Sequence, residues 1–105
     1  MTARLGLGIL SAAVSSACMA GTAAPQALLE RYKCVACHRD RESRTGPAYA
    51  DIAARYAGDP KAPARLAAAI RSGEHGRGPW PMPPHPEVSA ADAKAMVRYI
   101  LSMPN

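Results

Sequence analysis

The pentapeptide Cys34-Val35-Ala36-Cys37-His38 constrains this chain more than any other segment. On a helical turn, residues three positions apart lie on the same face, so the two thiols point in one direction. A histidine follows the second cysteine directly and stands four positions after the first. This spacing is typical of c-type haem attachment, in which both sulfurs form thioethers and the imidazole binds iron. The pentapeptide therefore predicts Cys34 and Cys37 as haem-binding residues and His38 as a metal ligand.

A second ligand of the iron is expected far along the chain, and Met82 is the candidate. It stands in the segment Pro79-Trp80-Pro81-Met82-Pro83-Pro84. A thioether is a soft ligand that stabilises ferrous iron and raises the potential of haem. A methionine is usually a core residue, but five of the ten prolines fall between residues 79 and 86, which makes this a poor core segment. Prolines fix backbone torsions, so the loop is expected to be stiff.

Together these residues resemble the small bacterial class I cytochromes c, from about Gln26 to the end of the chain. The resemblance implies an all-α, compact cytochrome c fold of about four short helices around one covalently attached haem c. It implies His38 and Met82 as axial ligands, and the carbonyl of Pro47 as the acceptor of the histidine ring N–H. The landmarks are the pentapeptide, Gly46-Pro47-Ala48-Tyr49, Pro81-Met82-Pro83-Pro84 and an amphipathic last helix ending near Leu101.

Apolar residues recur at helical spacing in four segments of the chain. These segments are residues 27–35, 49–56, 64–72 and a last helix that runs through Ser102. Glycines at positions 58 and 73 mark the ends of the second and third helices. Ser89, three residues before Asp92, predicts an N-terminal cap for the last helix. No segment alternates with a period of two over a useful length, so no sheet is expected.

The N-terminal residues 1–20 have the features of a secretory signal peptide. Arg4 precedes an apolar run over residues 5–14, and small residues follow. The run is too short to span a bilayer. Cleavage is expected after Ala20, or as late as Ala23, which leaves a monohaem cytochrome c domain at 21–105. The predicted location is therefore periplasmic.

The three cysteines agree with this division of the chain. An odd number is unfavourable for a secreted disulfide scaffold. If Cys18 leaves with the signal peptide, the two remaining cysteines are both used in thioethers. Lipidation of Cys18 is an alternative that would anchor the protein to a membrane. It is the less favoured one, because Ser15 stands where lipoprotein signals usually have leucine.

The charge of the chain bears on its partners. The formal net charge is +5, and loss of Arg4 with the signal peptide would leave +4. The basic residues around the pentapeptide form either an ordinary solvated face or a basic rim that steers the protein onto acidic redox proteins. Nucleic acid is disfavoured by export and by the lack of a recognition motif. The basic residues around the pentapeptide are Arg31, Lys33, Arg39, Arg41 and Arg44.

The predicted function is one-electron transfer by iron that cycles between Fe(III) and Fe(II), in transient complexes with redox proteins. An enzymatic role is not expected, because two axial ligands leave no position for a substrate. One alternative is an electron-accepting cytochrome subunit of a larger periplasmic oxidoreductase, such as a molybdenum enzyme or a nitrite reductase. A variant is a gas sensor in which Met82 leaves the iron, with His85 close enough in sequence to replace it.

The pentapeptide is also compatible with two functions that do not involve haem. Cys34 and Cys37 could form the dithiol of a thiol–disulfide oxidoreductase, but the strand-rich context of that class is absent. They could form half of a zinc site, but His75 and His85 are not at paired spacing. Both histidines are therefore expected to be solvated side chains.

Overall fold

The computed structural model describes residues 24–75 and 81–104, together with residues 3, 6 and 8. In chain order it contains α1 (Pro25–Arg31), the single 3₁₀ turn η1 (Cys34–Ala36), α2 (Tyr49–Arg55), α3 (Ala62–Ser72) and α4 (Ala90–Leu101). Extended pairing within these residues is limited to two isolated bridges, His38 with Ser43 and Glu74 with Met82. The all-α prediction is therefore confirmed.

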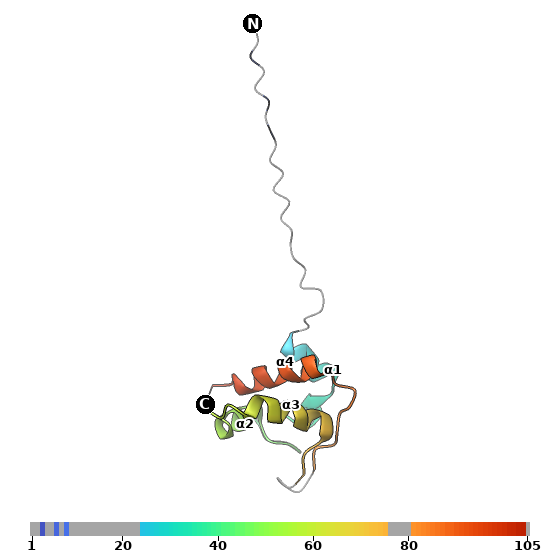
Figure 1. The fold of residues 1–105 in the computed structure, drawn as a ribbon. Coiled ribbons are helices and arrows are strands. Elements are labelled where there is room, and N and C mark those ends of the chain that lie inside the picture. The colour runs from blue at the N-terminus through green and yellow to red at the C-terminus, as the bar shows by residue number, and fades with distance from the viewer. Residues whose placement is uncertain (1–2, 4–5, 7, 9–23, 76–80, 105) are drawn as a thin grey trace.

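The C-terminal helix α4 is the central element of the fold. It contacts all three other helices, α1, α2 and α3, which surround it (Figure 1). Its apolar side is buried and includes Met96, which is a core residue as expected for a methionine at helical spacing. The core cluster consists of Leu28, Leu29, Tyr49, Ile70, Val88, Ala93, Met96, Val97 and Ile100.

The start of α4 is fixed by a cap and by a contact with the end of α1. The hydroxyl of Ser89 accepts the backbone N–H of Asp92 at 3.1 Å, which confirms the predicted cap. The carboxylate of Asp92 accepts the hydroxyl of Tyr32 at 2.6 Å. This hydrogen bond raises the pKa of Tyr32. The first bond therefore caps α4, and the second joins Tyr32, which follows the last residue of α1, to the first turn of α4.

The helix predicted over residues 27–35 is interrupted in the structure. It ends at Arg31, and Lys33 adopts the left-handed conformation, with φ +62° and ψ +23°. The 3₁₀ turn η1 then begins at Cys34. The left-handed residue changes the direction of the chain, so the pentapeptide does not continue the axis of α1. The other three helices agree with their predicted ranges to within two residues at each end.

Replacing Lys33 with glycine should stabilise the protein. A residue with a Cβ costs roughly 1–2 kcal/mol in the left-handed region, whereas glycine loses about 0.5–1 kcal/mol of backbone entropy. The free energy of unfolding of the haem-loaded protein, measured in guanidinium chloride, should rise by about 0.5–1 kcal/mol. Lys94→Gly, in the interior of α4, is the control and should lower it by about 1 kcal/mol. A Lys33→Gly protein less stable than the native one would contradict this account.

Candidate haem-binding site

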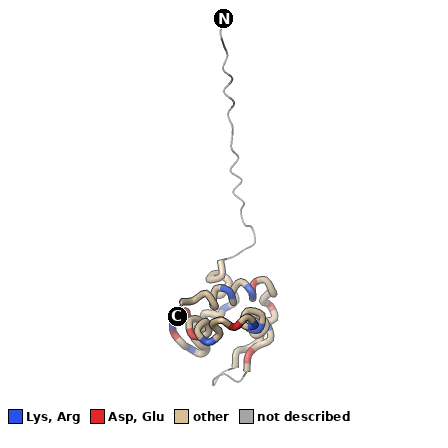
Figure 2. The backbone as a smooth tube through the Cα atoms, turned by 60° about the vertical axis from the view of Figure 1, so that its left-hand side comes forward, with Lys and Arg blue, Asp and Glu red and all other residues tan. Residues whose placement is uncertain are grey.

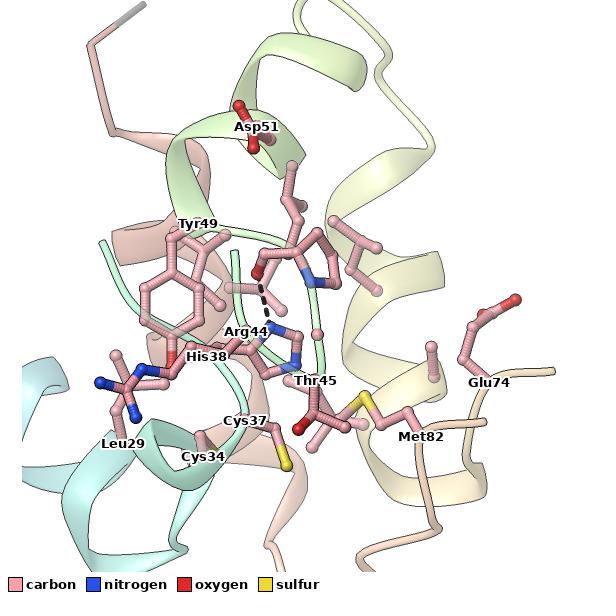
Figure 3. A pocket seen from close by; sticks show the side chains of 18 of the residues that line it. Leu29, Cys34, Cys37, His38, Arg44, Thr45, Tyr49, Asp51, Glu74 and Met82 are labelled. Atoms are coloured by element: carbon pink, nitrogen blue, oxygen red, sulfur yellow. Dashed lines mark hydrogen bonds between the residues drawn. The ribbon is translucent and has the colours of Figure 1, made fainter. Parts of the chain in front are cut away.

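A cavity of about 430 Å³ lies between the pentapeptide, α2, α3 and the segment that follows residue 80. Its volume is within the range of small-molecule and cofactor pockets. Much of its wall is apolar and comes from the helices that form the core. The cavity also brings together all four predicted site residues, Cys34, Cys37, His38 and Met82, from two distant parts of the chain (Figure 3).

The 3₁₀ turn positions the two cysteines. The N–H groups of Cys37 and His38 both donate to the carbonyl of Cys34, at 3.1 and 3.0 Å. Both thiols are free, half-buried and part of the cavity wall. Burial raises the pKa of the Cys34 thiol. The turn therefore presents two unpaired sulfurs to one space, as two thioether bonds to one porphyrin would require.

The imidazole of His38 is held on several sides. Its Nδ1 lies 2.7 Å from the carbonyl oxygen of Pro47, and because a carbonyl can only accept, Nδ1 carries the proton. The ring stacks on Tyr49 with centroids 5.5 Å apart and an interplanar angle of 21°. Gly46 packs so closely against the imidazole that a Cβ on Gly46 would lie 2.4 Å from Cε1 of His38. These contacts leave Nε2 as the nitrogen available to iron.

The segment that carries Met82 is bonded to the end of α3. Met82 and Glu74 exchange backbone hydrogen bonds of 2.9 and 3.0 Å. The α-carbon of Gly73, whose φ is +86°, lies so close to the Met82 segment that a Cβ on Gly73 would be 3.0 Å from the carbonyl oxygen of Met82. Farther along, the guanidinium Nε of Arg71 donates to the carbonyl of Val88 at 3.1 Å. The backbone of Met82 is thus fixed independently of its side chain.

The side chains of His38 and Met82 suit haem iron better than a bare metal ion. Figure 3 shows the Met82 sulfur directed across the cavity toward the His38 ring. One imidazole and one thioether are a complete axial pair for haem, and in the part of the chain that the structure describes no group of three or more His, Cys, Asp or Glu side chains is arranged to hold a bare metal ion. The hydroxyl of Tyr49 and Nδ1 of His85 are buried without hydrogen-bond partners among the described residues. The residues present therefore fit a haem, which would add contacts within this space.

The expectation that His85 is a solvated side chain is wrong. It is half-buried, and its ring lines the cavity. Its spacing of three residues from Met82, between Pro84 and Pro86, was the signal available in the sequence. His75 is exposed, as expected. Residues 76–80, which include Trp80, lie outside the described residues.

The sequence places Tyr49 in a family landmark and at the start of a predicted helix, but it does not predict the contact of Tyr49 with His38. The stack depends on the ring, whereas the buried hydroxyl has no partner in the described part of the chain. Tyr49→Phe should therefore change the free energy of unfolding by less than about 1 kcal/mol, whereas Tyr49→Ala should lower it by about 3–5 kcal/mol. Chemical unfolding of both variants checks this prediction. A Phe variant as unstable as the Ala variant would contradict it by assigning the stabilisation to the hydroxyl.

Comparison with known proteins agrees with this geometry. Residues 23–104 match the cytochrome c family. Cytochrome c-551 of Allochromatium vinosum is 43% identical over 90 residues, which cover 78% of this chain and 94% of that protein. Cytochrome c-552 of Nitrosomonas europaea is 43% identical over 93 residues, which cover 87% and 90% of the two chains.

Solved structures give the same result. The crystal structure of wild-type Nitrosomonas europaea cytochrome c552 matches with a TM-score of 0.72 and 42% identity, and covers 75% of this chain and 99% of that chain. The class 1 cytochrome MtoD of Sideroxydans lithotrophicus matches with a TM-score of 0.68 and 28% identity, covering 76% and 92%. On its sequence, its four helices and these relatives, this chain belongs to the cytochrome c family, whose members carry a covalently attached c-type haem and transfer electrons.

Proposed function

We propose that this protein is a periplasmic one-electron carrier with a haem attached through Cys34 and Cys37 and ligated by His38 and Met82. The observation that carries the proposal is the position of the imidazole and the thioether on opposite sides of one cavity that both thiols line. The haem, when bound, supplies an iron that changes between Fe(III) and Fe(II). The protein supplies the axial ligands and the apolar surroundings that set the potential.

The residues of the site suit electron transfer because little needs to move. The Pro47 carbonyl and the Tyr49 ring hold His38 in one orientation. The bonds to Glu74 and the neighbouring prolines hold the backbone of Met82. With both axial positions taken by side chains, no position remains for a substrate. This is the basis for proposing a carrier and not an enzyme.

Export is part of the proposal. Arg4 and the apolar run that follows it support a signal peptide at residues 1–20, with cleavage as late as residue 23 and a monohaem domain at 21–105. This N-terminal region lies almost wholly outside the described residues. In the described part of the chain, no helix is long and apolar enough to cross a membrane.

The proposed partners are redox proteins with acidic docking surfaces. Basic residues are distributed over the helical part of the molecule, with acidic residues among them (Figure 2). Lys33 and Arg44 are exposed and also contribute to the cavity wall, so they place positive charge beside the proposed haem site. Charge at this position would steer an acidic partner toward the site at which electrons leave. Arg31, Arg39 and Arg41 are exposed on the flanking segments.

The test is the optical spectrum of the exported protein, made in cells that contain haem-attachment machinery. We expect covalent haem, a sharp α band of low-spin iron after reduction, and the weak long-wavelength band of iron–methionine sulfur in the oxidised state. Covalent haem without the second band would exclude Met82 as a ligand. A protein with no haem and two titratable thiols would overturn the carrier proposal and favour a thiol–disulfide oxidoreductase.

A further inference from the structure

Tyr49 presents the face of its ring to the imidazole of His38. The two ring centroids are 5.5 Å apart and the ring planes differ by 21°, so the rings are stacked and do not meet edge to face. Figure 3 shows the two rings beside each other at the cavity. The face of an aromatic ring carries the negative part of its quadrupole, and the edge carries the positive part. The imidazole therefore lies next to the electron-rich side of the phenol ring.

The backbone around Tyr49 holds this stack in a place that excludes water. Tyr49 begins α2, and its N–H donates to the carbonyl of Arg39 at 2.8 Å, which ties the start of the helix to the residue that follows His38. On the other ring, the carbonyl of Pro47 accepts Nδ1–H of His38. Only 2% of the Tyr49 surface is exposed. An electrostatic interaction between the rings is therefore weakly screened by solvent.

The charge of the imidazole differs between the two oxidation states of the proposed carrier. Ferric iron carries one more positive charge than ferrous iron and draws more electron density from its ligands, so the bound imidazole of His38 is more positive in the ferric protein. An aromatic face attracts a positive group within about 6 Å of its centroid. The separation of 5.5 Å lies inside this range. The attraction between the rings should therefore be stronger in the ferric state.

We propose that the face of the Tyr49 ring stabilises the ferric state through the imidazole of His38, which makes Tyr49 a positioning residue that lowers the reduction potential. The inference rests on the proposed function, because it requires His38 to bind the iron. It assigns the effect to the ring and not to the hydroxyl, which has no hydrogen-bond partner among the described residues.

Fluorinated phenylalanines at position 49 test the charge of the ring face while nearly preserving the shape of the ring. Each fluorine withdraws electron density from the face, so the attraction should decrease stepwise from phenylalanine to pentafluorophenylalanine. Tyr49→Phe should keep the Fe(III)/Fe(II) equilibrium against a fixed reference couple near its native value. The fluorinated series should move this equilibrium progressively toward Fe(II), by about two- to fivefold at full fluorination.

Tyr49→Leu removes the ring and keeps an apolar side chain. It should also move the equilibrium toward Fe(II), whereas water that entered in place of the ring would stabilise the charged ferric site and move the equilibrium toward Fe(III). Tyr99→Leu is the matched control. Tyr99 is half-buried in α4, is not part of the cavity wall, and donates to the carboxylate of Asp40 at 3.4 Å. Its replacement should leave the equilibrium unchanged.

Nuclear magnetic resonance of the diamagnetic ferrous protein gives a readout of the stack itself. The ring-proton signals of His38 are shifted by the ring current of a stacked neighbour. They should stay near their native positions in Tyr49→Phe and move in Tyr49→Leu. These signals therefore show whether the ring at position 49 keeps its place when the equilibrium is measured.

The result that overturns the inference is the same equilibrium in the phenylalanine and pentafluorophenylalanine proteins. A progressive shift toward Fe(III) along the fluorinated series would overturn it as well. If Tyr49→Leu does not load haem, the fluorinated series still decides, since all its members retain the ring. A native protein without covalent low-spin haem would instead contradict the proposed function, since His38 would then not bind the iron.

Discussion

Met82→Ala should abolish the long-wavelength iron–sulfur band of the oxidised protein and lower its reduction potential. The variant loses the soft ligand that stabilises ferrous iron. Axial ligands set haem potentials over roughly 0.8 V, so a fall on the order of 0.1 V or more is expected. Haem should remain attached, because the attachment residues Cys34 and Cys37 are in the distant pentapeptide. The backbone bonds between Met82 and Glu74 do not involve the deleted atoms and should persist.

A second methionine separates ligand loss from simple destabilisation. Met96 is fully buried in α4, with 0% of its surface exposed. Met96→Ala should lower the free energy of unfolding by about 2–5 kcal/mol and leave the iron–sulfur band intact. Under this proposal, spectra and guanidinium chloride unfolding separate the two variants. Met82→Ala loses the iron–sulfur band, whereas Met96→Ala keeps the band and loses stability. A Met82→Ala protein that retains the band would remove Met82 from the list of ligands.

The parts of the site that the sequence predicts are those that depend on local spacing. Cys34, Cys37 and His38 lie within one turn, so their relative placement follows from a short stretch of helical backbone. The cap of α4 by Ser89 is local in the same way. Pairing His38 with Met82 is different, because it depends on how the end of α3, to which the Met82 segment is bonded, is placed relative to the pentapeptide. The proline-rich segment indicated a stiff loop, and the likeness to class I cytochromes c supplied the pairing.

The features that the sequence did not predict depend on packing between distant segments. Nothing in the preferences of lysine indicates the left-handed conformation of Lys33, which allows the chain to leave α1 and present the pentapeptide to the cavity. Tyr49 has helical spacing, but its stack on His38 depends on where α2 meets the pentapeptide. His85 is expected in solvent because its spacing does not suit a metal site, whereas the bond between its backbone N–H and Ile70 of α3 places it in the cavity wall.

Gly46→Ala should strongly destabilise the site, because the added methyl group has no space. A Cβ at this position would lie 2.4 Å from Cε1, 2.8 Å from Nδ1 and 2.9 Å from Nε2 of His38. The imidazole cannot move aside without breaking its bond to Pro47 or its stack on Tyr49. Overpacking and loss of one hydrogen bond together should lower the free energy of unfolding by about 2–4 kcal/mol. The yield of protein with correctly ligated haem should fall as well.

Gly58→Ala distinguishes this effect from ordinary backbone strain. Gly58 has φ +76°, and a Cβ there would meet nothing within 4 Å. The substitution therefore tests the left-handed backbone alone, with an expected cost of roughly 1–2 kcal/mol and no change in the haem spectrum. Gly46 is not among the residues with positive φ in the described part of the chain, so its cost should come from the His38 contact. If Gly46→Ala retained native stability and the native spectrum, the imidazole would have room to shift, and the orientation assigned to His38 would no longer be fixed by its neighbours.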